Sequence, residues 1–274
     1  MKKITPSKVL VFIALCLMTV TFIYPMFYMF VNGAKTIEGY AKDPFAIIMP
    51  GSSFSNYVML ISRFKLQNNF FNTIFITVVS ILLILSFCVC ASYAFAKVQF
   101  RFKTALYIAI IGTMLIPSQV TMIPLYVIFA SWGLINNPWS VILSYLAGGI
   151  PGCVFLLTAN FRGVPKEMLE AAEIDGCGYF RTVSMVVARI GSAAIFIYVV
   201  FSFIGFWNDL FTPMILIPKD SVRTIMVALA AVVGRYGDPP YQLAGLTLAT
   251  LPAIAVYIVF SRFIVKGVTM GSFK

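Results

Sequence analysis

The acidic side chains of this chain gather in one short stretch. Of its nine Asp and Glu residues, four lie within the ten residues 167–176, namely Glu167, Glu170, Glu173 and Asp175. Closely spaced carboxylates could form an acid–base pair or could pair with arginines on a partner. The stretch is polar and lies between two apolar segments. Carboxylates clustered in one exposed helix favour a binding surface over a buried acid–base pair.

Composition excludes most other chemistry. The chain has no His, which rules out the Ser-His-Asp triad and zinc sites built on His. It also lacks the Gly-x-x-x-x-Gly-Lys-Ser/Thr loop that cradles nucleotide phosphates. We interpret the five cysteines as small apolar packing residues, because none has metal-ligand spacing; they are Cys16, Cys88, Cys90, Cys153 and Cys177. We therefore expect a chain that is not an enzyme, with no metal site.

The acidic stretch has the signals of a short helix. Pro165 suits the first helical turn, where a missing N–H costs nothing, and Glu167 follows near the positive end of the helix dipole. Glu170 and Glu173 share a face, and we expect Ala171 and Ala172 to leave a flat surface beside it. Gly176 then ends the helix, because glycine tolerates the left-handed conformation. A second short helix, Tyr179 to about Ala188, completes a helix-turn-helix.

Six apolar segments surround this loop. Hydrophobic residues make up 61% of the 274 positions and charged residues 11%, which indicates an all-α integral membrane protein. A membrane-spanning helix needs about 20 mostly apolar residues. The predicted spans are 9–31, 71–95, 106–129, 139–161, 190–211 and 241–264, within a single transmembrane domain covering 1–274. The apolar segment 225–233 is too short to cross and could be re-entrant or interfacial.

The basic residues indicate the orientation of the chain. Thirteen Lys and Arg residues fall on the side that holds both termini and the loop 162–189, and seven fall on the other side. Because cytoplasmic loops carry the excess of Lys and Arg, we expect a multi-pass protein of a bacterial-type plasma membrane with both termini in the cytoplasm. The dispersed positive charge, +11 in total, indicates contact with membrane lipid and not with nucleic acid. The first span is treated as a retained anchor.

Polar groups inside or beside the spans are candidates for a substrate path. Pro117 and Pro124 predict a kink in the third span, which either faces a wet cavity or serves packing alone. The candidate lining residues are Gln119, Tyr145, Asn208 and Asp209, with Trp207 as an aromatic platform. The alternatives are helix packing, favoured for Tyr145, and interfacial anchoring, favoured for Asp209 because it lies near the predicted edge.

At the level of motifs, the sequence resembles the permeases of ABC importers. The stretch Glu170–Gly176 matches the "EAA…DG" loop of that family, and Phe161–Glu167 is similar to its lead-in. Further matches, at 115–126, 203–209 and in the tail 266–274, are similar to the maltose-type carbohydrate permeases, in particular to the second, six-span subunit. The chain departs from the pattern at Ala188-Arg189, where the family usually has Leu-Pro, and at Val183, where it usually has an aromatic residue.

The resemblance implies a set of partners and roles. Two unlike permeases would form the pore, two cytoplasmic ATP-binding subunits would hold ATP and Mg, and an extracytoplasmic binding protein would deliver a carbohydrate such as an oligosaccharide. The residues that would couple to the ATPase are Glu167, Glu170, Ala171, Ala172, Asp175 and Gly176. The tail residues Gly271, Ser272, Phe273 and Lys274 would reach the ATPase interface.

Other functions remain open from the sequence. An ion-coupled secondary carrier is one alternative, although such carriers usually bury Asp, Glu or His in mid-span and the predicted spans lack them there. An ABC importer for a solute other than sugar is another. A third is a membrane scaffold whose acidic helix recruits a regulator.

Overall fold

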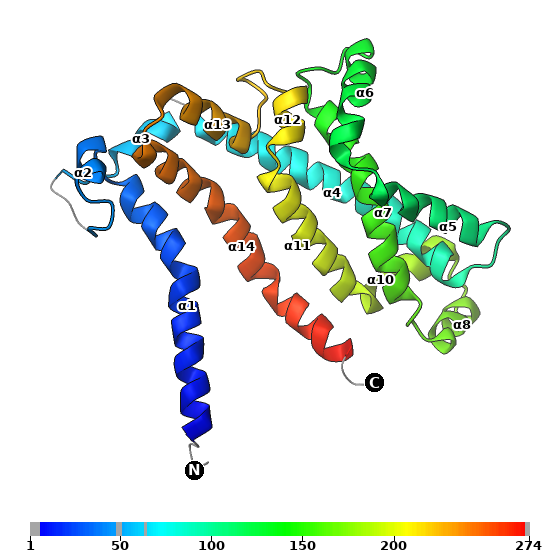
Figure 1. Ribbon diagram of the computed structural model, residues 1–274. Coiled ribbons are helices and arrows are strands. Elements are labelled where there is room, and N and C mark those ends of the chain that lie inside the picture. The colour runs from blue at the N-terminus through cyan, green and yellow to red at the C-terminus, as the bar shows by residue number, and fades with distance from the viewer. Residues whose placement is uncertain (1–5, 48–50, 63–64, 272–274) are drawn as a thin grey trace. The chain divides into compact units, whose positions relative to one another are not determined.

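The computed structural model describes residues 6–47, 51–62 and 65–271, and all regular structure within these ranges is helical (Figure 1). The described part of the chain is therefore all-α, as its composition predicts. The elements are α1 (Pro6–Gly33), α2 (Ile37–Lys42), α3 (Ser55–Ser62), α4 (Leu66–Lys97), α5 (Lys103–Gly112), the 3-10 turn η1 (Thr113–Leu115), α6 (Ser118–Ser131), α7 (Pro138–Phe161), α8 (Lys166–Ile174), α9 (Tyr179–Thr182), the π-helix η2 (Val183–Val187), α10 (Ala188–Ile190), α11 (Ser192–Asn208), α12 (Phe211–Leu216), α13 (Ile225–Tyr236) and α14 (Pro239–Gly271).

These helices divide into two compact units. Unit 1 comprises Met1–Gln67 and Ala228–Leu251, and unit 2 comprises Asn68–Val227 and Pro252–Lys274. Unit 2 contains the acidic stretch and most of the polar residues that the sequence singles out. Each unit has its own set of contacts and is described by itself.

Four helices are long and apolar enough to cross a membrane. They are Ser7–Gly33, Leu66–Lys97, Pro138–Phe161 and Pro239–Ser261, which correspond to the first, second, fourth and sixth predicted spans. The third and fifth predicted spans fall in two bent helix pairs, Lys103–Leu115 with Ser118–Ser131 and Tyr179–Ile190 with Ser192–Asn208. Among the described residues there are thus four candidate spans, or up to six if each bent pair counts as one.

The third predicted span is broken, and not merely kinked, at its first proline. The two halves meet at 97°, and Pro117 precedes the first residue of α6. Ile116 is extended, with φ −86° and ψ 116°, because a residue before proline is excluded from the helical region. Pro124 lies inside α6 without ending it. The third predicted span, 106–129, therefore bends where a kink was predicted, but as two separate helices that meet at Pro117.

The fifth predicted span, 190–211, corresponds to α11 and begins at a bend. The helical segments Tyr179–Ile190 and Ser192–Asn208 meet at an angle of 80° at Gly191. A side chain on Gly191 would collide with the ring of Phe161, so glycine is required for this close approach. The stretch predicted as one helix from Tyr179 instead contains a π-helical turn, which begins at Val183, where the family usually has an aromatic residue.

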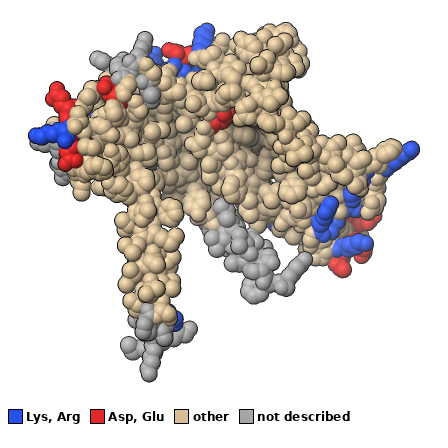
Figure 2. All heavy atoms as spheres, viewed as in Figure 1, with Lys and Arg blue, Asp and Glu red and all other residues tan. Residues whose placement is uncertain are grey.

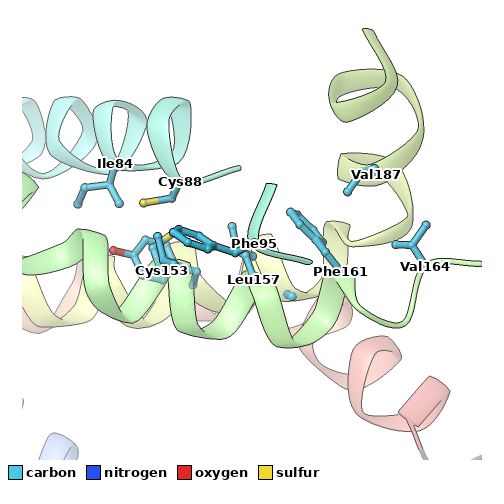
Figure 3. Packing of buried hydrophobic residues seen from close by; sticks show 11 residues of the cluster. Ile84, Cys88, Phe95, Cys153, Leu157, Phe161, Val164 and Val187 are labelled. Atoms are coloured by element: carbon cyan, nitrogen blue, oxygen red, sulfur yellow. The ribbon is translucent and has the colours of Figure 1, made fainter. Parts of the chain in front are cut away.

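The core of unit 2 lies between α4 and α7. Figure 3 shows side chains of the two helices pointing toward one another, with Val164 and Val187 beside Phe161 at one end. The labelled residues of this cluster are Ile84, Cys88, Phe95, Cys153, Leu157, Phe161, Val164 and Val187. Cys88 and Cys153 are buried, as expected for cysteines that serve as apolar packing residues.

Unit 1 is organised around the end of α1. The Asn56 amide nitrogen donates hydrogen bonds to the carbonyls of Gly33 and Lys35, at 2.9 and 2.8 Å. Lys35 is itself only 1% exposed, and its Nζ donates to the Asp43 carbonyl at 3.0 Å. Burial lowers the pKa of the Lys35 ammonium, although nearby Asp43 opposes the change. These bonds fix the chain as it leaves α1.

Charged side chains occupy a small part of the visible surface. Figure 2 shows basic and acidic residues side by side over the end of unit 2 that carries α8 and the α4–α5 turn. The visible faces of the long helices show almost no charge. The large apolar side chains of α1 are exposed along most of its length, as expected for a helix that contacts lipid or another apolar surface.

Candidate functional site

A cavity of about 1100 Å³ lies within unit 2. Its walls come from η1, α6, α7, α11 and the start of α12, and small, polar and apolar residues line it. The broken helices matter for this geometry. A break lets polar side chains and free backbone groups face a cavity, where their hydrogen-bonding needs can be met.

The α11 wall is a single helical stripe. Ser202, Gly205, Phe206 and Asp209 all line the cavity, at positions i, i+3, i+4 and i+7. This spacing is readable in the sequence, although sequence reasoning selected the neighbouring residues 207 and 208 instead. The stripe presents a hydroxyl, an aromatic ring and a carboxylate beside a glycine that leaves room between them.

The α7 wall follows the same periodicity with smaller residues. Ser144, Tyr145, Gly148, Gly149 and Gly152 line the cavity. At Gly149 a side chain would collide with Ile84 of α4 and with the Tyr198 hydroxyl of α11, which donates to the Gly149 carbonyl at 2.9 Å. Glycine therefore allows α4 and α11 to approach α7 on either side.

The third wall comes from the break at Pro117. Thr113 precedes the break, and Ser118, Gln119 and Thr121 follow it, all at the cavity. The sequence left two interpretations of this polar, proline-containing segment, a wet cavity or packing alone. Because the segment lines the cavity, the first interpretation is favoured.

Tyr145 and Asp209 join two walls of the cavity. The Tyr145 hydroxyl donates to Asp209 Oδ2 at 3.0 Å, and the Tyr145 ring stacks on Phe206 with centroids 4.2 Å apart. The other carboxylate oxygen, Oδ1, accepts from the backbone N–H groups of Phe211 and Thr212, at 2.9 and 3.3 Å, which shapes the turn into α12. Both oxygens of Asp209 are thus engaged within the chain.

Two predicted lining residues lie away from the cavity. Trp207 is fully buried, with its ring 5.4 Å from that of Phe70 and 5.5 Å from that of Phe203. Asn208 is exposed, and its amide donates to the Ile204 carbonyl one turn earlier. Phe206, one residue earlier on the helix, is the aromatic side chain of this segment that faces the cavity. Gln119, Tyr145 and Asp209 do lie at the cavity.

The acidic stretch forms α8, Lys166–Ile174, and its end has a well-defined cap. The N–H of Cys177 donates to the Ala172 carbonyl and the N–H of Gly176 to the Glu173 carbonyl, each at 2.9 Å. This pair of bonds is the Schellman motif, which places the residue after the cap in the left-handed region. Gly176 has φ +73°, as its role in ending the helix requires.

The two sides of α8 differ in exposure. Glu167, Glu170, Glu173, Asp175 and Ala171 are exposed. Ala172 is only 6% exposed, so it packs inward and does not extend the flat outer surface predicted for both alanines. Ala172 is buried because it shares a helical face with Leu169, three residues earlier, which packs on the apolar core.

Beside the carboxylates, α8 and the following helix α9 also expose apolar side chains. Ile174 is 87% exposed and Phe180 is 74% exposed. Acidic residues around exposed aliphatic and aromatic groups are typical of a surface that binds another protein. The predicted tail contact falls on Gly271, the last residue of α14, and on Ser272, Phe273 and Lys274, which lie outside the described residues.

The helical order and this loop have counterparts in known proteins. Residues 88–270 match the family described as "Binding-protein-dependent transport system inner membrane component". The chain belongs to this family of transport permeases. The matched region contains α8 and every residue that lines the cavity.

Curated relatives of this permease match it over most of their length. The diacetylchitobiose uptake system permease protein NgcG of Streptomyces coelicolor is 27% identical over 95% of this chain and 87% of its own. The melibiose/raffinose/stachyose import permease protein MelC of Bacillus subtilis is 29% identical over 81% of each chain. The permease is thus similar to relatives from both Streptomyces and Bacillus.

The fold of this permease also has solved counterparts. A chain of a bacterial ABC transporter involved in the import of the acidic polysaccharide alginate superposes with a TM-score of 0.77 at 21% identity, covering 96% of this chain and 99% of that one. A chain of the alginate ABC transporter in complex with an alginate pentasaccharide-bound periplasmic protein superposes with a TM-score of 0.67 at 12% identity, covering 91% and 92%. The likeness establishes the helical architecture.

Proposed function

We propose that this permease forms half of the membrane channel of an ATP-driven importer and that its cargo is an uncharged oligosaccharide. The observation that carries the proposal is the position of α7. Its residues 144–156 supply one wall of the cavity, and its end at Phe161 leads through four residues into α8. One helix therefore connects the cavity with an exposed acidic surface.

The proposed topology is a single transmembrane domain with six spans. In this topology each bent helix pair counts as one span, and both termini and α8 face the cytoplasm. The Lys and Arg excess supports that orientation, because positive residues are retained on the cytoplasmic side. The proposed spans place the break at Pro117 and the cavity beside it inside the membrane.

We infer that α8 is the surface that docks on a cytoplasmic ATPase. Glu167, Glu170 and Asp175 are exposed and can pair with arginines, while Ile174 supplies an apolar anchor. Ala171 allows close approach on the outer side, and Ala172 and Gly176 hold the shape of the helix. Two ATP-binding subunits would bind ATP and Mg, so this chain needs no cofactor of its own. The tail 271–274 is proposed to reach the same subunits.

The cavity fits an uncharged sugar. Among the residues that line it, Asp209 is the one charged side chain, and both of its oxygens already accept hydrogen bonds within the chain. Hydroxyl and amide groups from Ser118, Gln119 and Ser144 can bind sugar hydroxyls, and Phe206 offers a ring for stacking. The names of the relatives, which include carriers of diacetylchitobiose and of melibiose, raffinose and stachyose, support a neutral oligosaccharide.

Two further partners complete the proposed transporter. A second, unlike permease would close the channel, and an extracytoplasmic binding protein would deliver the sugar. The likeness to a transporter solved with its periplasmic protein supports the second partner.

The test is uptake by the assembled complex. The tagged permease is purified from its native membranes with its bound subunits and is reconstituted into liposomes with ATP inside and the extracytoplasmic binding protein outside. Uptake is then measured for neutral malto-, xylo- and chito-oligosaccharides and for an oligouronate as the acidic comparison. We expect ATP-dependent uptake of a neutral sugar and none of the uronate.

The coupling role is tested in the same preparation. Glu170→Lys places a cation where a carboxylate is proposed to meet arginines, so it should abolish uptake and sugar-stimulated ATP hydrolysis while leaving membrane insertion intact. Uptake that needs an ion gradient and persists without ATP would contradict the proposed function.

A further inference from the structure

The C-terminal end of α4 holds the acidic loop on both sides of α8. Cys90, Tyr93 and Lys97 lie at i, i+3 and i+7 in the last two turns of α4 and therefore share one helical face. This face contacts the chain just before α8 through Lys97 and just after α8 through Cys90 and Tyr93. Sequence analysis did not single out Tyr93 or Lys97, and it assigned Cys90 to apolar packing.

The first contact is made by the Lys97 ammonium. Its Nζ donates to the carbonyls of Arg162 and Val164, at 2.9 and 2.6 Å. Arg162 caps the end of α7, where the last carbonyls lack partners within the helix and the dipole favours a cation. Lys97 therefore fixes the four-residue connection between α7 and α8 to the end of α4.

The second contact is made by Tyr179, the first residue of α9. Its hydroxyl donates to the Cys90 carbonyl at 2.7 Å, and its ring lies against that of Tyr93 with centroids 5.2 Å apart. The segment that follows α8 is thus fixed to the same face of α4, two turns before Lys97.

Between these two contacts, α8 packs on the core that α4 shares with α7. Leu169 and Val164 belong to that apolar cluster. Further along α4, Ile84 lies directly against Gly149 of the cavity wall. Because packed interiors are stiff, a displacement of α8 should move the end of α4 and, through it, the wall of the cavity.

We propose that Lys97 and Tyr179 are positioning residues that couple the motion of α8 to α4, so that α4 carries force from the ATPase to the cavity. The proposal rests on the proposed docking function of α8. All three acceptors are backbone carbonyls, so the two donor side chains alone decide whether the contacts form. Substitution of a donor therefore weakens the link without altering the exposed surface of α8.

The experiment measures sugar transported per ATP hydrolysed by the reconstituted complex. Lys97→Met removes the ammonium but keeps the apolar stem, and Tyr179→Phe removes one hydroxyl but keeps the ring contact. From the usual contribution of a hydrogen bond, we expect the ratio to fall about threefold in Tyr179→Phe and about tenfold or more in the double variant. Basal ATP hydrolysis, copurification with the ATPase and the melting temperature should stay near wild type.

Matched controls separate coupling from folding. Lys103→Met removes a lysine whose Nζ also donates to a backbone carbonyl, that of Val98 at 2.8 Å, but within the α4–α5 turn. Tyr107→Phe removes a hydroxyl from a tyrosine that packs on the same core. Both controls should keep the wild-type ratio, and Lys97→Arg should restore much of the ratio lost in Lys97→Met.

The outcomes are distinguishable. A wild-type ratio in both the Tyr179→Phe and the double variant would overturn the positioning role. If melting temperature, basal ATP hydrolysis and uptake all fell together, the residues would serve the stability of the fold, and the positioning role would also be overturned. Absence of ATP-dependent uptake in the wild-type complex would instead contradict the proposed function itself.

Discussion

The Tyr145 hydroxyl donates a hydrogen bond to Asp209 Oδ2 at 3.0 Å, and this bond ties α7 to the turn that follows α11. Because Asp209 Oδ1 also accepts the backbone N–H groups that begin α12, one carboxylate organises three elements around the cavity. A residue that the sequence suggested as an interfacial anchor is therefore part of the cavity wall.

Loss of the Tyr145–Asp209 bond should loosen that wall. Tyr145→Phe leaves the carboxylate one donor short, at a cost of about 1.5–3 kcal/mol for a hydrogen bond to a charged group. We expect a lower melting temperature of the detergent-purified complex and weaker sugar uptake. Asn208→Ala is the matched control, since Asn208 bonds only within its own helix, and a Tyr145→Phe complex as stable as this control would argue against the account.

Adjacent aromatic residues of α11 should respond differently to truncation. Phe206 lines the cavity, whereas Trp207 is fully buried against Phe70 and Phe203. Phe206→Leu should raise the KM for sugar while the complex keeps nearly its normal stability. Trp207→Leu should instead lower the free energy of unfolding by a few kcal/mol, as large-to-small core substitutions do. Uptake kinetics and thermal unfolding of both variants check the contrast, and the reversed pattern would contradict it.

The left-handed cap of α8 predicts that Gly176 does not tolerate a side chain. An Ala at φ +73° costs about 1–2 kcal/mol, and the strain should distort the end of the helix next to Ile174. We expect Gly176→Ala to reduce sugar-stimulated ATP hydrolysis. Gly178→Ala is the control, because Gly178 has φ −72° and open space around its Cα. Equal activities of the two variants would show that the left-handed cap is not needed for coupling.

The bend at Gly191 predicts that a second substitution can partly compensate for a first. Gly191→Ala should clash with the Phe161 ring and lower both stability and uptake. Shortening the facing side chain in Gly191→Ala/Phe161→Leu should recover part of the loss, which a double-mutant cycle measures as a coupling energy. Gly112→Ala, in a helix with open space at that position, should be tolerated. Strictly additive losses in the cycle would contradict the close contact.

Sequence reasoning located elements better than it located side chains. The four unbroken spans and the left-handed Gly176 follow from apolar length and from glycine at a helix end, which are local signals. The breaks at Pro117 and Gly191 depend on how the two halves pack, and proline alone does not give their angles. The choice of Trp207 over Phe206 failed because both residues are aromatic. They differ in the direction they face on the helix, since Trp207 packs on Phe70 and Phe203 whereas Phe206 faces the cavity.

The same limit applies to the two alanines of α8. Both are small enough for a docking surface, but Ala172 faces the core with Leu169. The hydrogen bonds of Lys97 and Tyr179 had no sequence signal, because their acceptors are backbone carbonyls far away in the chain.

Cross-linking from α8 tests the central claim most directly. Ile174 is the most exposed large apolar residue of α8, so Ile174→Cys, in a Cys177→Ser background, is treated with a short cross-linker in native membranes. The account predicts a covalent product with an ATP-hydrolysing subunit, and none from Val58→Cys in α3. No product from Ile174→Cys in membranes that retain ATP-dependent uptake, or labelling of that cysteine from the outside of intact cells, would contradict the account.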